Sequence, residues 1–529
     1  MSSTVVVCSY LCALTLALVL AHSTDRTCPS PCKCSQTRLE DIGDIYKVVC
    51  SEKKLQAIPS LDILKPVPLP IHLHFNENDI RSIRSLAFPP NVNIDSLDLS
   101  RNKQVIIEPM TFTNLAPSLT KLTLEAINLN FDSPLTMISG LDHLRELSIS
   151  HNNRKGYVAG AVEKVMVTLL SGSVTRSLRI LRMAHCGIRE LNKDAFKYLT
   201  YLEELDLSNN WFHYVPEAIR SLRHLKKLIL VSTKIVKITD DAFLTLSHLE
   251  WLEMSRSDIE IIEKYAFRGL EKSLKRLYLE RCKLKKIPSE EIKHLKKLEY
   301  LDLTMNYFET ASAHSFVGEY CLKTLLISGS NLKFERDTFS GQKDCIIDLA
   351  IKQMNLSVIP REALSKLNKL QQLSLERTEI KTLPRSAMVG IKAKTISLAE
   401  NNLNYIAPGA FLGLPSRVEL NLRRTKVSDI DFLLGYEDEA IATVNLDKTE
   451  LQCRCSMESS LNATLNIAIF GACLKNNKTL IPFDSYMLKS VLSDACEEER
   501  SRNAISSLYK LRSQELLPLL LVLVRYLSS

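Results

Sequence analysis

The chain has 529 residues, more than the ~100–200 residues of one ordinary compact core, so several domains or a repeat array are expected. It holds only 15 Gly and 19 Pro among abundant aliphatic residues, which excludes a low-complexity protein. The net charge of +8 is modest for this length and does not call for nucleic acid or an anionic membrane as a partner.

Residues 1–23 are typical of a secretory signal. The stretch 5–20 is apolar and the chain then becomes small and polar, so cleavage is expected after Ala21 or Ser23. A transmembrane anchor is the alternative, but the apolar run is at the short end of what spans a bilayer. Export implies an extracellular protein in an oxidising compartment, so cysteines are interpreted first as disulfides.

One motif recurs about sixteen times over residues 70–451. Its register is L-x-x-L-x-L-x-x-N-x-L, and several copies carry a Phe near their far end. Consecutive copies begin, for example, at Leu202, Leu225, Leu249, Leu274 and Leu298. The pattern resembles the extracellular leucine-rich repeat family, and the resemblance covers most of the chain.

The spacing within the motif is consistent with this fold. The second and third Leu lie two residues apart and point the same way from a short strand, into a core, while the residues around them point outward. One unit cannot bury its apolar edge alone, so units stack and their strands form one parallel sheet. The sequence therefore predicts an α/β leucine-rich repeat solenoid, a horseshoe with the sheet on its concave wall and loops and short helices on its convex side.

The ninth position of the motif falls where the chain turns off the strand and buried backbone groups need hydrogen-bond partners. Cys186 and Cys282 occupy this position, so we expect both to be buried thiols without a reactive role. Ile127 and Met354 depart from the pattern. Elsewhere the position holds a small polar residue: Asn78, Asn102, Asn152, Asn210, Asn306, Asn401, Thr233, Thr378, Thr425, Thr449, Ser257 and Ser330.

Cysteines cluster at both ends of the array, where an open stack would expose its core. Both clusters resemble the disulfide-bonded caps of secreted leucine-rich repeat proteins, here residues 24–69 and 452–500. The interval from Cys34 to Cys50 is longer than the family usually shows, so the resemblance does not predict the structure of the loop in that cap. Zinc is the alternative, but export and the position of the clusters disfavour it, so no metal or other cofactor is expected. The resemblance implies the pairs Cys28–Cys34, Cys32–Cys50, Cys453–Cys473 and Cys455–Cys496.

Cys321 and Cys345 stand one repeat apart, each directly before the first Leu-type position of its motif. Equivalent positions in adjacent parallel strands lie roughly 4.7–4.9 Å apart, within the reach of a disulfide, so we expect these two residues to be bonded. Sequons predict N-glycosylation at Asn355, Asn462 and Asn477.

Two further segments interrupt or follow the array. The interval from Leu144 to Leu178 is about ten residues too long, and residues 158–170 are expected to form a convex-side helix, with a binding protrusion as the alternative. The tail 501–529 ends in an apolar run too short to span ~30 Å of hydrocarbon. Its layout resembles a glycolipid-anchor signal, and a soluble secreted protein with an apolar tail is the alternative.

Outward charges and aromatic residues mark a candidate partner-binding patch. Trp251, Tyr278 and Tyr300 occupy outward positions on consecutive strands and would form one aromatic surface. The residues around them would form a polar rim: Lys275, Arg276, Glu299 and Asp302. The alternative is cross-strand packing that stabilises the sheet without a ligand. Residues 272–297 are also rich in Lys and Arg, so a polyanion-binding patch is weighed against a solvated face on which the charges of successive strands alternate.

The chain contains no G-x-S-x-G, H-E-x-x-H, phosphate-binding glycine loop or dinucleotide fingerprint, so it is not expected to be an enzyme. The long array with two caps is most similar to chaoptin- and connectin-type adhesion proteins and to guidance-receptor ectodomains. This implies a cell-surface or secreted protein that binds a protein ligand or receptor through the concave face. A second copy of the chain is included among the possible partners. Membrane contact is expected only through the glycolipid anchor. The alternative function is a soluble immune or matrix recognition protein for microbial or glycosaminoglycan ligands.

Overall fold

The structure is a computed structural model that describes residues 28–526 with internal gaps. The gaps are 86, 104, 132, 153–163, 166–169, 171–173, 330–331, 435, 437–439, 456, 458–466 and 476–478. The expected signal 1–23 and the sequons at Asn462 and Asn477 therefore lie outside the described residues. The chain divides into two compact units, Met1–Leu274 and Lys275–Ser529, which are described one after the other.

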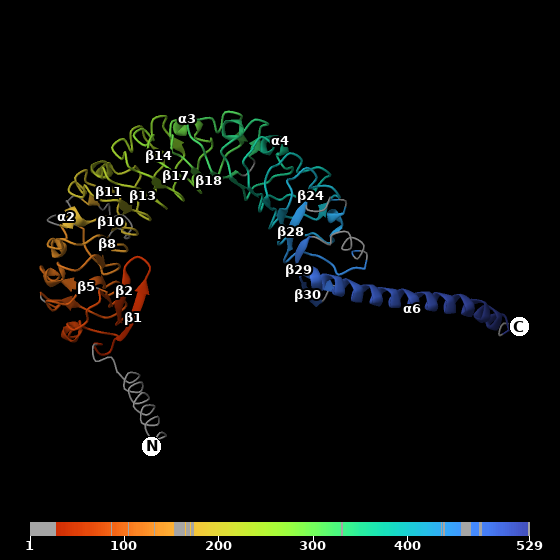
Figure 1. The fold of residues 1–529 in the computed structure, drawn as a ribbon, viewed down its shortest axis with the longest axis horizontal. Helices are drawn as coiled ribbons and strands as arrows, with labels where there is room; N and C mark the ends of the chain where they lie inside the picture. The colour runs from red at the N-terminus through yellow and green to blue at the C-terminus, as the bar shows by residue number, and fades with distance from the viewer. Residues whose placement is uncertain are drawn as a thin grey trace, which may run out of the picture. The chain divides into compact units, whose positions relative to one another are not determined.

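In the first unit the strands of the repeats form one sheet (Figure 1). It opens with an antiparallel hairpin of β1 (Lys33–Leu39) and β2 (Gly43–Val49), and every later pair is parallel. The parallel strands are β3 (Ile71–His74), β5 (Ile94–Asp98), β7 (Lys121–Thr123), β8 (Glu146–Ser148), β10 (Ile180–Arg182), β12 (Glu204–Asp206), β13 (Lys227–Ile229) and β15 (Trp251–Glu253).

The motif explains this register. Leu181, Leu205, Leu228 and Leu252 hold the same motif position and are direct partners across neighbouring strands. All four are 0% exposed, so a slip of one residue would turn them out of the core. The phenylalanines that recur near the far end of the motif are buried, and the rings of Phe243 and Phe267 stack with centroids 6.1 Å apart.

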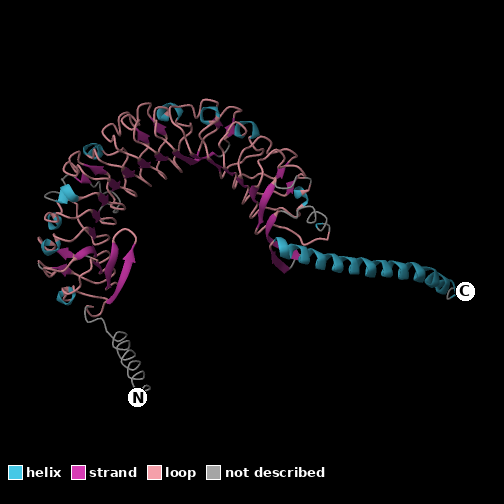
Figure 2. Cartoon of the chain, in the orientation of Figure 1, coloured by secondary structure: helices cyan, strands magenta, loops and turns pink. Residues whose placement is uncertain are grey.

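The other side of the first unit carries short two-strand sheets and single helical turns (Figure 2). The pairs are β4 (Ser82–Ile83) with β6 (Ile106–Ile107), β9 (Lys164–Val165) with β11 (Glu190–Leu191), and β14 (Lys237–Ile238) with β16 (Ile261–Ile262). The turns are α2 (Val174–Ser177) and 3-10 helices at Asp62–Leu64, Thr113–Leu115, Thr136–Ile138 and Glu217–Ser221.

The helix expected over residues 158–170 is wrong at Lys164 and Val165. These two residues form β9 and pair in parallel with Glu190 and Leu191 of the following turn. Pairing with a neighbouring turn therefore overrides the local preference for a helix. The other residues of the expected helix, apart from the buried Leu170, lie outside the described residues.

The second unit repeats the plan and ends in a cap. Its parallel strands are β17 (Arg276–Tyr278), β18 (Tyr300–Asn306), β20 (Thr324–Gly329), β22 (Asp348–Ile351), β23 (Gln372–Ser374), β25 (Thr395–Ser397), β27 (Val418–Asn421), β28 (Ile441–Leu446) and β29 (Ala468–Lys475), with β30 (Thr479–Phe483) antiparallel to β29. Its two-strand sheets are β19 (Thr310–Ala311) with β21 (Lys333–Phe334) and β24 (Thr382–Leu383) with β26 (Tyr405–Ile406).

Helix is scarce in this unit too, apart from the last element. The short helices are α3 (Ser289–Ile292), α4 (Arg361–Leu364) and 3-10 turns at Ser340–Gln342 and Asp431–Leu433, and the chain then runs into α6 (Ser485–Tyr526). Within the described part of the chain, none of the helices combines the length and the apolar character that crossing a bilayer requires. The parallel sheets with little helix confirm the predicted leucine-rich repeat solenoid.

The ninth position forms the predicted ladder of buried polar side chains. The Asn210 amide donates to the carbonyl oxygens of Leu207 in its own turn and Met183 in the preceding turn, at 2.9 and 2.8 Å. Its oxygen accepts from the backbone N–H groups of Cys186 and Ile188, both at 3.1 Å. Each asparagine of the ladder thereby satisfies the backbone of two turns where they bend off the sheet, whereas Thr425 and Thr449 bond within their own turns.

Candidate partner-binding surface

The outward face of the first sheet carries a continuous chain of opposite charges. Lys121 Nζ lies 2.9 Å from a Glu146 carboxylate oxygen, and the same carboxylate contacts the Arg182 guanidinium. Arg182 also lies 3.3 Å from Glu204, whose other oxygen is 3.6 Å from Lys227 Nζ. These five residues cross five neighbouring strands, so the expected alternation of charge extends beyond the strands on which it was noted.

The charges in this chain hold one another in their ionised forms. Burial opposes ionisation of Glu146, but the hydrogen bond from Lys121 and the positive charges of Lys121 and Arg182 outweigh it, so the pKa of Glu146 is lowered. A charge that is already paired on its own sheet contributes less binding free energy to a partner than an unpaired charge would. This part of the wall is therefore better suited to orienting a ligand than to anchoring it.

Trp251 stands at the end of this chain of charges. Lys227 Nζ lies 5.2 Å from the centroid of its ring, within the range of a cation–π contact. The indole Nε1–H donates to a Glu253 carboxylate oxygen at 3.3 Å. The side chain is half-buried, so one part of the indole faces outward on β15 as the motif predicts.

Tyr278 and Tyr300 form a ring pair on β17 and β18 in the second unit. Their centroids are 4.7 Å apart with 35° between the ring planes, and both residues are half-buried. Burial and the nearby Asp302 carboxylate raise the pKa of the Tyr300 hydroxyl. Trp251 belongs to the first unit, so the structure brings together the two tyrosines, and a patch of all three stays a prediction.

The expected polar rim is only partly exposed. Lys275, Arg276 and Glu299 are exposed, and Glu299 pairs with Lys323 on the next strand at 3.0 Å. Asp302 is 8% exposed, and its carboxylate accepts from the backbone N–H and the hydroxyl of Thr304 at 2.9 and 2.7 Å. Burial raises the pKa of Asp302 against those hydrogen bonds. Asp302 therefore offers little surface to a partner, because its carboxylate is nearly buried and bonded to Thr304, and its place in the rim stays a prediction.

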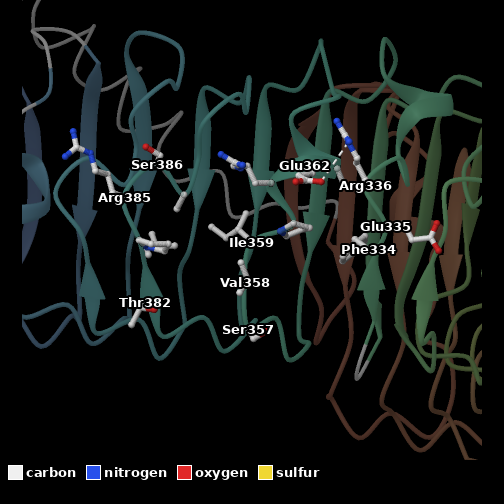
Figure 3. Close-up of a pocket in the computed structure, with 16 residues that line it drawn as sticks. Phe334, Glu335, Arg336, Ser357, Val358, Ile359, Glu362, Thr382, Arg385 and Ser386 are labelled. Carbon is white, nitrogen blue, oxygen red and sulfur yellow. Dashed lines mark ion pairs between the residues drawn. The ribbon is translucent and has the colours of Figure 1, made fainter.

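A hollow of about 590 Å³ lies in the second unit beside the two-strand sheets, away from the outward face of the long parallel sheet (Figure 3). It opens because Ser357, Val358 and Ile359 form no strand, although β21 and β24 on either side belong to two-strand sheets. Arg336 Nε on its rim lies 3.9 Å from a Glu362 carboxylate oxygen. The exposed Asn355 precedes Ser357 by two residues, so a glycan there would overhang the hollow and disfavour it as a protein-binding site.

Disulfides close both ends of the array and link one pair of turns within it. The structure joins Cys28 to Cys34 and Cys32 to Cys50 before the repeats, and Cys453 to Cys473 and Cys455 to Cys496 after them. It also joins Cys321 to Cys345, whose Cα atoms are 5.2 Å apart. Among the described residues Cys186 and Cys282 are the cysteines outside a disulfide, and both are buried as expected.

The described residues include no group of three or more His, Cys, Asp or Glu side chains placed to hold a metal ion. One feature of the surface, a cleft beneath the β1–β2 hairpin, was not predicted from the sequence. The signal that pointed toward it was the long interval between Cys34 and Cys50, which forms this hairpin.

Comparison with known proteins agrees with the geometry. Residues 176–235, 223–284 and 272–332 match the family described as "Leucine rich repeat", and residues 343–449 match "BspA type Leucine rich repeat region (6 copies)". Vasorin from Mus musculus is 29% identical over 123 residues, 23% of this chain and 17% of Vasorin. Chaoptin from Drosophila melanogaster is 29% identical over 228 residues, 42% of this chain and 16% of Chaoptin. The chain thus spans less than a fifth of the length of either curated relative.

A solved structure has a similar fold at low sequence identity. A chain in the "Structure of the Toll - Spatzle complex, a molecular hub in Drosophila development and innate immunity" superposes with a TM-score of 0.51 and 15% identity. The superposition covers 82% of this chain and 70% of that one.

Proposed function

Because the chain is a leucine-rich repeat protein of the extracellular type with disulfide-bonded caps at both ends, we propose that it binds another protein at the cell surface or as a secreted factor. The partner docks on the outward side chains of the parallel sheet. The observation that carries this proposal is the Tyr278–Tyr300 ring pair, which presents aromatic surface beside the exposed cations Lys275 and Arg276. Tyrosine with a charged surround is typical of the residues that dominate protein interfaces.

An adhesion role is the form of this function that we favour, with the partner on another cell or a second copy of the chain. Cells that express the full chain should bind members of a library of extracellular protein domains that includes the chain itself. Clustering of those cells with one another would identify homophilic binding. If no member of the library binds and the cells do not cluster, the proposal fails.

The binding surface is tested with Tyr278→Ala combined with Tyr300→Ala. We expect the affinity for the partner to fall by more than ~2 kcal/mol while thermal stability changes little. Tyr307→Ala and Tyr405→Ala are matched controls, because both tyrosines are exposed, at 57% and 56%, outside the proposed patch. Unchanged binding by the double variant would move the interface to another part of the molecule.

A second candidate function rests on four exposed cations that follow β17, namely Arg281, Lys283, Lys285 and Lys286. Closely spaced cations attract sulfated polyanions, which would make the chain a matrix or immune recognition protein. Retention on heparin that falls steeply with salt, and that falls further in Lys285→Ala with Lys286→Ala, would favour this function over adhesion.

A further inference from the structure

A cleft lies beneath the N-terminal hairpin in the first unit. Its volume is about 940 Å³, and its lining combines the end of the hairpin with residues of β3, β5, β7, β8 and β10 and of the turns that lead into the neighbouring strands. Figure 1 shows the β1–β2 hairpin on the same side as the sheet's outward face. The cleft thus has two walls of different chemistry, and both belong to one compact unit.

The hairpin wall is apolar. Leu39 and Ile42 line the cleft, and Ile42 at the tip is 53% exposed. A single exposed isoleucine is common on protein surfaces. This one differs because it faces a concave space across from charged side chains, where a bound group could cover it.

On the sheet wall, two neighbouring turns carry charges of the same sign at one motif position. Arg145 and Arg179 hold the same motif position on neighbouring turns, and the Arg179 backbone N–H donates to the Arg145 carbonyl oxygen at 2.8 Å. Arg179 Nε lies 3.7 Å from a Glu203 carboxylate oxygen, whereas the exposed Arg145 forms no ion pair within the described part of the chain. Arg179 also donates from one guanidinium nitrogen to the carbonyl oxygens of Arg176, Ser177 and Leu178, which holds its side chain in place. Two like charges at the same position of neighbouring turns attract an anion.

The remaining lining decides the class of ligand. Four carboxylates also face the cleft: Asp95, Asp142, Glu146 and Glu203. A sulfated polysaccharide carries many closely spaced negative charges, whereas most cations here are already paired with these carboxylates. It also offers no apolar group to cover Ile42. A polypeptide can place one carboxylate beside a large apolar side chain, which matches both walls.

We propose that this cleft holds an extended segment of a protein partner in which an acidic side chain adjoins a large apolar one. The acidic group binds Arg145 and Arg179, and the apolar group packs on Leu39 and Ile42. The inference rests on the proposed protein-binding function and narrows it to the N-terminal end of the array.

The probe is a phage-displayed library of random dodecapeptides selected on the full chain. Enriched peptides should share an acidic residue next to a large apolar one, and a synthetic peptide of that sequence should bind the chain in solution. Arg145→Ala and Ile42→Ser should each weaken its binding at least about tenfold. Arg84→Ala and Ile106→Ser are the controls, since both residues are exposed in the same unit and lie outside the cleft, and they should leave the affinity unchanged.

Three outcomes would contradict the proposal that the cleft binds a peptide segment. These are selection of no peptide, binding that is insensitive to Arg145→Ala and Ile42→Ser, and binding of heparin oligosaccharides alone through Arg145. None of them affects the test of the Tyr278 surface, so the proposed function can survive the loss of the cleft. Conversely, peptide binding that depends on Arg145 and Ile42 supports the cleft even if the screen of extracellular domains finds no partner.

Discussion

The side chain of Asn401 joins its turn to the one before it by donating a hydrogen bond to the Leu375 carbonyl oxygen at 2.7 Å. The same amide donates to Leu398 at 2.7 Å, and its oxygen accepts from the Thr378 N–H at 2.8 Å. One side chain thus satisfies buried backbone groups of both turns.

Asn401→Ala should lower the free energy of unfolding by about 3 kcal/mol, because it leaves buried backbone groups of two turns without a partner. Asn402→Ala is the matched control, since Asn402 is adjacent and exposed, and it should cost less than about 0.5 kcal/mol. Urea unfolding followed by circular dichroism measures both. Equal losses for the two variants would show that the ladder adds no stability of its own.

Gly269 is required by close approach as well as by its backbone conformation. Its φ is +95°, and a Cβ atom there would lie 2.4 Å from the Leu244 carbonyl oxygen. Gly269→Ala should therefore cost at least about 2 kcal/mol, because backbone must move to relieve the clash. Gly140→Ala, where a Cβ would meet nothing within 4 Å, should be close to neutral in the same unfolding measurement. A neutral Gly269→Ala would contradict the close contact between these turns.

The Cys321–Cys345 bond should be present in the folded protein and should stabilise the second unit. Peptide mapping without reductant should recover the two cysteines in one linked fragment. Cys345→Ser should cost about 3 kcal/mol, because the bond closes a loop of 24 residues. The double variant Cys321→Ser with Cys345→Ser should cost no more than the single one. Alkylation of both thiols in the native protein would rule the bond out.

Glu146 should make stability depend on pH. Its pKa is lowered in the folded state, so its ion pairs contribute stability above its ordinary pKa, and that contribution is lost as the pH falls through the lowered value. Glu146→Gln should therefore destabilise the protein by about 1 kcal/mol near pH 7 and by much less near pH 3. Glu260→Gln, at an exposed residue without an ion pair in the described part of the chain, should show no such change. The test fails if the Glu146→Gln difference is the same at both pH values.

Cys186 should be chemically inert while the protein is folded. Burial raises the pKa of its thiol to about 12, and its Sγ contacts the carbonyl oxygens of Ile149 and Ala184 at 3.4 Å. Iodoacetamide at about pH 8 should label it only after guanidinium is added, because the thiolate is the nucleophile. Rapid labelling of the native protein, located by mass spectrometry, would contradict the buried ladder position.

The repeat register was predictable because each turn repeats the same physical demands. Leu205 and Leu228 must both enter the core, Asn210 must satisfy a buried bend, and Lys226 faces Glu203 at 2.7 Å as the alternation of charge predicts. The placement of Asp302 was not predictable in this way. Its motif position marks it as outward, but its carboxylate accepts two hydrogen bonds from Thr304 and is only 8% exposed, which the motif does not indicate.

Features that depend on contacts between distant segments could not be predicted from the sequence. The interval between Cys34 and Cys50 shows that the first cap is unusual, but only the fold places Ile42 against Arg145 and Arg179 across one cleft. Lys164 and Val165 have no local preference for a strand strong enough to notice, and Glu190 and Leu191 supply their pairing.

The pairing of neighbouring turns tolerates a difference in the length of chain between them. Ile180 pairs directly with Glu146, and Cys186 reaches Ile149 in the turn before it, although the interval between these turns is about ten residues longer than the others. Sheet and ladder thus stay in phase across an interval of different length. Evolution, or an engineer inserting a reporter peptide, can lengthen the chain between Asn152 and Val174 without disturbing the outward face on which binding is proposed.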